Sequence, residues 1–120
     1  MPLKNVQYIV QFGKRFLESM HKLIKTPEFE EWYDEQPLKS KFQIDDRLSN
    51  IESVGHFGVH KELTEEVSEL KWDNGRRVYY AYLAKQNILL LLGGNKNGQD
   101  KDIRKATKIF RKYAEEDTSP

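Results

Sequence analysis

The glycine-rich segment Gly93-Gly94-Asn95-Lys96-Asn97-Gly98 is the part of the chain whose residue types most clearly suggest chemistry. Because it is expected to open a helix, its backbone amides and the positive end of the helix dipole could hold a phosphate. It is not a nucleotide-binding P-loop, since the Gly-Lys-Ser/Thr sequence of that motif is absent. A plain strand-to-helix connection is the alternative interpretation of the same segment.

Metal and thiol chemistry are not expected. The three histidines are His21, His56 and His60, and the pair His56 and His60 has no third ligand nearby, which makes a poor zinc site. The chain contains no cysteine, so a disulfide framework, a thiolate zinc site and a cysteine nucleophile are excluded. We therefore expect no metal and no cofactor.

The 120 residues suffice for one domain with a single core, which excludes a multidomain enzyme. Charged residues make up 32% of the chain and aromatic residues 12%, which indicates a folded protein with a charged surface. The net charge of +1 conceals a segregation: residues 28–69 carry four basic and twelve acidic residues, whereas residues 93–113 carry seven basic and two acidic ones. The basic region can form a polyanion-binding face. A solvated charged helix is the alternative.

Neither a membrane nor secretion is indicated. No stretch approaches the roughly 20 apolar residues that span a bilayer. The N-terminal residues 1–20 lack the apolar core of a secretory signal. A cytoplasmic protein without membrane contact is expected.

Two helices are predicted in the N-terminal half. Thr26-Pro27-Glu28 is typical of a helix start, because threonine accepts a hydrogen bond from free backbone amides and proline suits the first helical position. The first helix is expected to stop by Pro37 and the second before Gly55. The predicted apolar faces contain Phe29, Trp32 and Tyr33 in the first helix and Leu38, Phe42, Ile44, Leu48 and Ile51 in the second.

The C-terminal half alternates in a way that predicts strands. Residues 67–72 and 76–83 predict a hairpin, with positive φ at both residues of the Asn-Gly pair in its turn, Asp73-Asn74-Gly75. The apolar run 88–92 predicts a strand buried on both faces at the centre of the sheet. A last helix follows, with Ile103, Ala106, Phe110 and Tyr113 on its apolar face.

These elements predict an α+β fold in which an N-terminal helical hairpin and a C-terminal helix pack on a small antiparallel sheet. Residues 21–25 suit either a helix or an edge strand, and we favour the edge strand.

Four segments resemble one family, the RelE/ParE superfamily of bacterial toxins, and within it the phage-derived, HigB-like "addiction module killer" branch. They are Thr26-Pro27-Glu28-Phe29-x-x-Trp32, Val67-Ser68-Glu69-Leu70-Lys71, Arg77-Val78-Tyr79-Tyr80 and the long segment from Leu90 to Ala106. The resemblance covers about residues 20–113 and implies an extension over residues 1–19 followed by a single RelE-like toxin domain, residues 20–120. In two places the chain departs from the family pattern: Arg76 stands where a tyrosine is usual, and residues 55–66 replace a glycine-rich turn.

The resemblance implies the toxin of a type II toxin–antitoxin system. Such a toxin enters the ribosomal A site and inhibits translation as a metal-independent mRNA endoribonuclease. Its partners would be the ribosome, mRNA and a cognate antitoxin, usually a helix-turn-helix protein in this branch. Two alternatives stay open: a toxin of the same fold that poisons a protein such as DNA gyrase, and a non-catalytic RNA-binding or interaction module.

Roles follow from the chemistry of RNA cleavage, in which attack of a ribose 2′-hydroxyl builds negative charge on the phosphate oxygens. Arg77 is expected to supply the cation, because its guanidinium matches phosphate geometry and a strand holds it rigidly. Alternation places Tyr79 on the same face, where it could stack on a base or relay a proton. Lys71 and Lys96 are expected phosphate contacts, and either could act as a base only if neighbouring cations favour its neutral form.

Further RNA contacts are assigned to Arg76, Asn97, Gln99, Lys101, Arg104 and Lys105. Arg76 has an alternative role in a salt bridge at the edge of the core. Asp100 is expected to cap the last helix, or else to orient the substrate together with Gln99. Tyr80 and Tyr82, on the strand face opposite Arg77, and Phe110 are predicted core residues.

Overall fold

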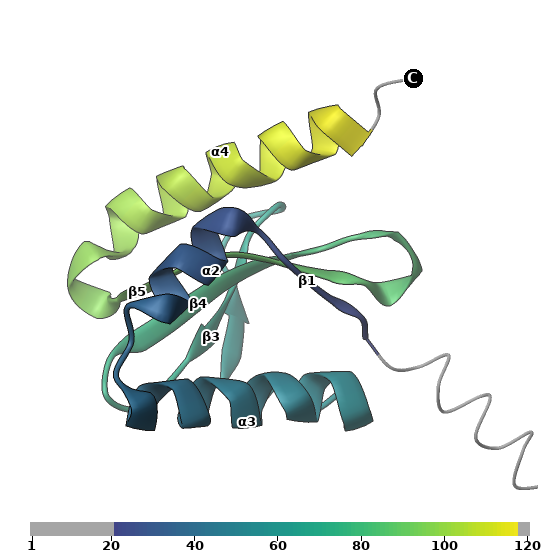
Figure 1. The fold of residues 1–120 in the computed structure, drawn as a ribbon. Helices are drawn as coiled ribbons and strands as arrows, with labels where there is room; N and C mark the ends of the chain where they lie inside the picture. Colours follow the sequence, from purple (N-terminus) through teal and green to yellow (C-terminus); the bar gives the residue numbers. More distant parts are fainter. Residues whose placement is uncertain (1–20, 118–120) are drawn as a thin grey trace, which may run out of the picture.

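The computed structural model describes residues 21–117, in which a strand, two helices, four strands and a final helix follow one another (Figure 1). They are β1 (Leu23–Lys25), α2 (Pro27–Asp34), α3 (Leu38–Val54), β2 (His60–Glu62), β3 (Ser68–Lys71), β4 (Arg76–Tyr82), β5 (Ile88–Asn95) and α4 (Gln99–Asp117). Short 3₁₀ turns cover Ala84–Gln86 and Lys96–Gly98. The α+β class and the edge strand are confirmed, whereas strand β2 was not predicted. The expected extension over residues 1–19 lies outside the described residues.

Helices α2 and α3 begin and end where the sequence predicts. The Thr26 hydroxyl accepts a hydrogen bond from the backbone amide of Phe29 (3.1 Å), which satisfies one free donor at the start of α2. Helix α3 stops at Gly55, whose φ of 70° is a left-handed conformation that favours glycine.

One part of the apolar pattern of α3 is misleading. Leu38 and Phe42 are 67% and 64% exposed, although the pattern predicts them in the core. A helix turns about 100° per residue, so Phe42 lies on the side of α3 opposite the buried Ile44, and Leu38 is the first residue of the helix on the same side as Phe42. The apolar residues of this helix therefore form two stripes, of which one faces the sheet.

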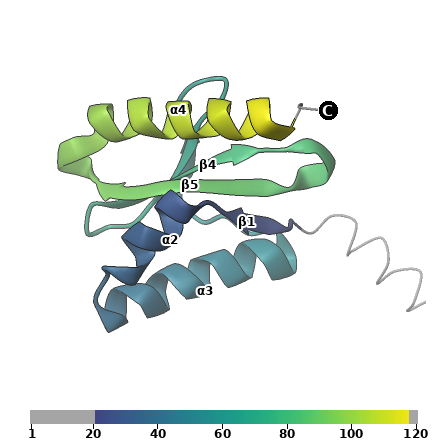
Figure 2. The same cartoon turned by 45° about the horizontal axis from the view of Figure 1, so that its top comes forward.

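The five strands form one mixed sheet in the order β1-β5-β4-β3-β2. Strands β2 to β5 pair antiparallel, but β1 runs parallel to β5, with Leu23 opposite Ile88 and Lys25 opposite Leu90 (Figure 2). The prediction of an antiparallel sheet is wrong at this edge, because side-chain alternation carries no information about the direction of a neighbouring strand. The central strand is β4 rather than β5, but β5 has a strand on each side, consistent with its continuous apolar run.

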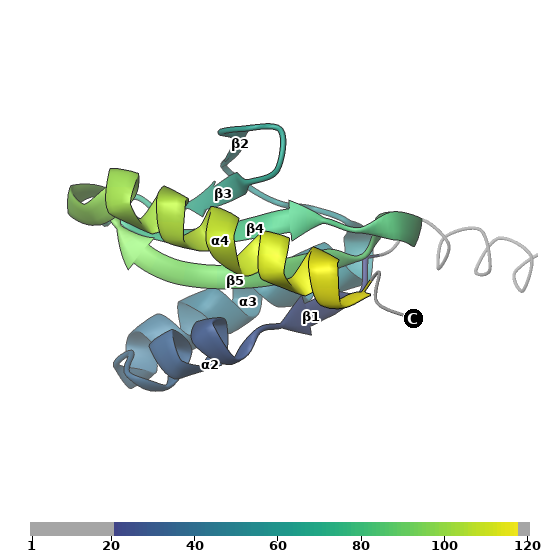
Figure 3. The ribbon, with the colours of Figure 1, turned by 90° about the horizontal axis from the view of Figure 1, so that it is seen from above.

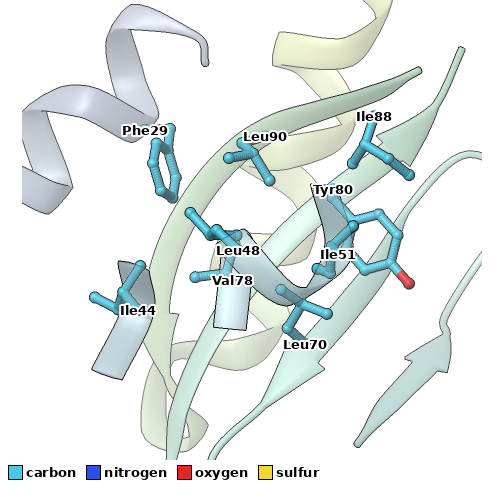
Figure 4. Close-up of a cluster of buried hydrophobic side chains, with 9 residues drawn as sticks. All are labelled: Phe29, Ile44, Leu48, Ile51, Leu70, Val78, Tyr80, Ile88 and Leu90. Atoms are coloured by element: carbon cyan, nitrogen blue, oxygen red, sulfur yellow. The ribbon is translucent and has the colours of Figure 1, made fainter. Parts of the chain in front are cut away.

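Helices cover both faces of this sheet (Figure 3). Helices α2 and α3 close one core, seen in Figure 4, which contains Phe29, Ile44, Leu48, Ile51, Leu70, Val78, Tyr80, Ile88 and Leu90. Helix α4 closes the other, which contains Val67, Tyr79, Ala81, Leu89, Leu91, Leu92, Ala106 and Ile109. The core positions predicted for Tyr80 and Phe110 are confirmed, with Phe110 at the edge of the second core. Tyr82 is 52% exposed, because β4 ends at this residue.

The β3–β4 turn has the predicted length but differs from the prediction in the backbone conformation of Asn74. The Trp72 amide donates to the Arg76 carbonyl (3.0 Å), which closes a loop of the three residues Asp73-Asn74-Gly75. In such a loop only the last residue needs a positive φ, and Gly75 has it (94°) while Asn74 does not. The Asn74 side-chain carbonyl instead accepts a hydrogen bond from the Arg76 amide (3.0 Å).

Candidate functional site

The glycine-rich segment begins inside the sheet rather than in a flexible loop. Gly93 and Gly94 belong to β5, and only Lys96–Gly98 form the turn that leads into α4. A Cβ on Gly93 would lie 2.0 Å from the Trp32 ring, and one on Gly94 would lie 2.2 Å from a carboxylate oxygen of Asp102. The two glycines therefore allow α2 and α4 to approach opposite faces of the same strand.

Hydrogen bonds fix the turn at the end of β5, where α4 begins (Figure 1). The Lys96 amide donates to the Gly75 carbonyl (2.9 Å), which ties the turn to the β3–β4 hairpin. The Asn95 side-chain carbonyl accepts from the Asn97 amide (2.9 Å). Asn95 thus caps the 3₁₀ turn that precedes α4, whereas Asp100, which was expected to cap the last helix, lies in the first turn of α4. The turn is held in place before any ligand binds.

An open pocket lies over this turn and the first turns of α4. Its lining residues are Lys96, Asn97, Gly98, Gln99, Asp100, Lys101 and Arg104. Five of them are among the predicted site residues. The pocket contains three cations and one carboxylate, and the cationic side chains are exposed. A net positive, solvent-open pocket at a helix N-terminus is suited to an anion.

Arg77 does not line this pocket. It is 9% exposed on the face of β4 that α4 covers, and its Nε lies 3.6 Å from a carboxylate oxygen of Glu69. Its Nη1 donates to the backbone carbonyls of Arg76 (3.0 Å) and Trp72 (3.5 Å). The guanidinium predicted to meet a scissile phosphate is therefore paired with a buried carboxylate and with the backbone of its own hairpin.

Glu69 is the functional candidate that the sequence analysis missed. It is 1% exposed, and its carboxylate also accepts a hydrogen bond from the Gln99 side-chain amide (2.9 Å). Strand alternation contained the signal, because Glu69 shares a face with Lys71 and lies opposite Tyr79 in the neighbouring strand. A carboxylate at a position that faces the core needs a partner, and Arg77 is on the adjacent strand.

Tyr79 is fully buried beneath α4, so it is not accessible to a base for stacking. Its hydroxyl has no hydrogen-bond partner among the described residues. Burial first, and then the nearby carboxylates of Asp102 and Glu69, raise the pKa of Tyr79 to about 12. A phenol in this environment stays protonated at neutral pH and acts as part of the core.

Three further predicted residues lie outside the pocket. Lys71 is half-buried at the end of β3, opposite Arg77. Lys105 faces a different pocket, between α2 and α4, whose lining includes Glu28 and Glu31. Arg76 points to the opposite face of the sheet from Arg77.

Two side chains of α3 hold Arg76 in place. Its guanidinium donates to the Ser40 hydroxyl (2.7 Å) and the Gln43 side-chain carbonyl (3.0 Å), and it lies over the Trp72 ring. Burial lowers the pKa of Arg76 from its usual value. Its partners are neutral, so the salt bridge considered as an alternative role does not form, and Arg76 joins the β3–β4 hairpin to α3.

Sequence comparison adds one relative. No family model matches the chain. An 82-residue alignment with a Haemophilus influenzae protein, described as "Uncharacterized protein", has 37% identity and spans 65% of this chain and 81% of the relative. The chain belongs to the same family as this Haemophilus influenzae protein. The relationship assigns no activity to the chain.

The described residues of this family member offer no other obvious centre for chemistry. Within residues 21–117, no group of three or more histidine, aspartate or glutamate side chains is placed to hold a metal ion. None of the helices in the same range has the length and apolar character needed to cross a bilayer. Among the described residues, the candidate functional groups are therefore the charged side chains of the pocket at the start of α4 and the buried Arg77–Glu69 pair below the helix.

Proposed function

We propose that the chain is a type II toxin of the RelE/ParE kind that cleaves mRNA on the ribosome without a metal. The observation that carries the proposal is the pocket at the start of α4, in which Lys96, Lys101 and Arg104 surround one turn. Asn97 and Gln99, two of the predicted RNA contacts, line the same pocket. Cations and amide groups around an open helix N-terminus match the phosphates and bases of a single RNA strand.

In this proposal a phosphate of the mRNA would lie over the turn, between Lys96 and Arg104. The 2′-oxygen would form a bond to phosphorus, and the 5′-oxygen of the next nucleotide would leave. The two cations would stabilise the charge that develops on the nonbridging oxygens. One proton must leave the 2′-hydroxyl and one must reach the leaving oxygen. Lys96 and Asp100 are the side chains of the pocket that we expect to accept and donate these protons.

The proposal includes the partners that the family resemblance implies. The ribosome would present the mRNA, which places the activity in the cytoplasm. A cognate antitoxin, expected to be a helix-turn-helix protein, would keep the toxin inactive in growing cells.

A second candidate, a non-catalytic RNA-binding module, is favoured by one specific observation. Arg77 and Tyr79, two of the four residues predicted to be catalytic, are buried, and Arg77 is paired with Glu69. In this candidate the pocket would bind RNA with no cleavage. Both candidates use the same pocket, so a single set of variants addresses them.

The experiment compares wild type with the double variant Lys96→Ala/Arg104→Ala. Induced wild type should arrest growth, and primer extension on a reporter mRNA should reveal cuts within codons. The double variant should permit growth and leave the mRNA intact. In vitro, its affinity for a labelled single-stranded RNA should fall about tenfold or more, and the slope of log K against log salt should decrease by about 1.4, because two phosphate contacts are lost.

The matched control is Lys39→Ala/Lys61→Ala, which removes the same charge from exposed positions on α3 and β2. It should behave as wild type. RNA binding that depends on the pocket, without arrest or cleavage, would favour the non-catalytic module, and arrest with intact mRNA and an SOS response would favour DNA gyrase as the target. Equal RNA affinity of wild type and both double variants would contradict the pocket as an RNA site.

A further inference from the structure

Glu69 is a buried charge that the proposed reaction does not use. It lies on β3 beneath α4 and is 1% exposed. Removing a carboxylate from water is strongly unfavourable unless other groups replace the lost hydration. Its partners in the structure are therefore the first indication of its role.

Those partners come from two different elements. Gln99, the first residue of α4, donates its side-chain amide to Oε2 of Glu69 (2.9 Å). Arg77 on β4 places Nε 3.6 Å from the same oxygen, a distance at which the charges attract without a hydrogen bond. One oxygen atom thus joins the sheet to the first turn of the helix.

Gln99, the α4 residue in this contact, is also part of the pocket. It lines the pocket together with Lys96, Lys101 and Arg104, while Glu69, which accepts its hydrogen bond, is buried. The Lys96 turn is separately tied to the β3–β4 hairpin by its bond to Gly75. Two hydrogen bonds therefore anchor the pocket to the sheet: the backbone bond from Lys96 to Gly75 and the side-chain bond from Gln99 to Glu69.

We propose that Glu69 is a positioning residue for the anion-binding pocket: by accepting the Gln99 amide, it holds the start of α4 in the orientation that binds an RNA phosphate. This inference rests on the proposed function of the pocket. Glu69 does not itself contact RNA, because it is 1% exposed. The two contributions of Glu69 to RNA binding oppose each other. Its hydrogen bond to Gln99 favours binding, whereas its negative charge opposes binding, since a carboxylate near the pocket repels a polyanion.

Two substitutions separate position from charge. Glu69→Gln and Glu69→Met remove the same negative charge and keep a similar volume, but only glutamine retains an oxygen that accepts from Gln99. We expect Glu69→Gln to bind a labelled single-stranded RNA as tightly as wild type or more tightly. Glu69→Met should bind about fivefold more weakly, the loss expected for one hydrogen bond. Equal affinities of the two variants would overturn the proposal.

Two further measurements keep the inference testable under other outcomes. If Glu69→Met does not fold, Glu69→Asp replaces it: aspartate keeps the charge but is one methylene too short, so weaker binding than wild type is expected, and wild-type affinity would overturn the proposal. Hydrogen exchange of backbone amides 101–105 is independent of RNA. It should be faster in Glu69→Met or Glu69→Asp than in wild type and unchanged in Glu69→Gln.

These readouts separate the inference from the proposed function. Absence of RNA binding by wild type would refute the proposed function, while the exchange rates would still decide whether Glu69 positions α4. The control is Glu66→Gln, which removes a carboxylate of the same region that bonds to Arg111 outside the pocket. It should leave both RNA affinity and exchange in the first turns of α4 unchanged.

Discussion

The open pocket and the buried pair beneath α4 contain the same kinds of side chain in opposite environments. In the pocket, Lys96, Lys101 and Arg104 are exposed and outnumber the carboxylates. Below the helix, Arg77 and Glu69 are buried and balance one another. Exposed cations remain available to an anion, whereas a buried cation is committed to its neighbour. The difference makes the pocket suited to bind an anion, as the proposed function requires, and the pair suited to support the fold.

The largest expected effect concerns Arg77. Arg77→Ala should lower the free energy of unfolding by about 3 kcal/mol, because it leaves the Glu69 carboxylate buried without its cation. Urea unfolding monitored by circular dichroism measures this loss. A loss of RNA cleavage in this variant would therefore not by itself identify Arg77 as catalytic.

A double substitution provides the control for this prediction. Arg77→Met/Glu69→Met removes both charges and keeps the volume, and it should recover most of the stability, since replacing a buried ion pair by apolar groups is often neutral or favourable. If Arg77→Ala instead unfolds at the same urea concentration as wild type, the pair contributes nothing to folding. The contrast between pocket and pair would then disappear.

Much of the fold follows from local sequence signals. Thr26 and Gly55 mark the ends of the two N-terminal helices because capping depends on residues within one turn. The run 88–92 predicts a buried strand because its apolar character is continuous. The parallel pairing of β1 with β5 was not predictable in this way, since it joins segments far apart in the chain and depends on which strand edge is free.

In the candidate site, too, the features set by local sequence were predicted and those set by long-range contacts were not. Asn97, Gln99, Lys101 and Arg104 surround Lys96 because neighbouring residues at a turn and the start of a helix lie close together in any fold. The environment of Arg77 depends on long-range contacts with Glu69 and on the helix that covers the strand. Alternation gave the correct face of Arg77 and Tyr79, but it did not reveal that α4 covers this face.

An intermediate effect is expected at Tyr79. Tyr79→Phe removes a buried hydroxyl that has no partner among the described residues, so the free energy of unfolding at pH 8 should stay equal or rise by up to about 1 kcal/mol. RNA binding and any cleavage should be unchanged, because the ring is not accessible from the pocket. A loss of cleavage without a loss of stability would return Tyr79 to the catalytic set.

The same substitution has a predictable pH dependence. Burial raises the pKa of Tyr79 to about 12, above the value of about 10 for a tyrosine in the unfolded chain. As pH rises from 10 to 12 the unfolded state releases this proton first, so wild-type stability should fall with pH in that window. The decrease measured by urea unfolding between pH 9 and pH 11 should be smaller in Tyr79→Phe than in wild type.

The smallest effect is expected at Arg111, a cation of α4 outside the pocket. Its guanidinium donates two hydrogen bonds to the Glu66 carboxylate, at 2.8 and 3.0 Å, and these bonds lower the pKa of Glu66. Both groups face solvent, so Arg111→Ala should shift Tm by no more than about 2 °C. Its RNA affinity should stay within about twofold of wild type, while Arg104→Ala, with the same change of charge on the same helix, should weaken binding more. Equal losses in the two variants would mean that the net charge of α4, rather than the geometry of the pocket, determines RNA binding.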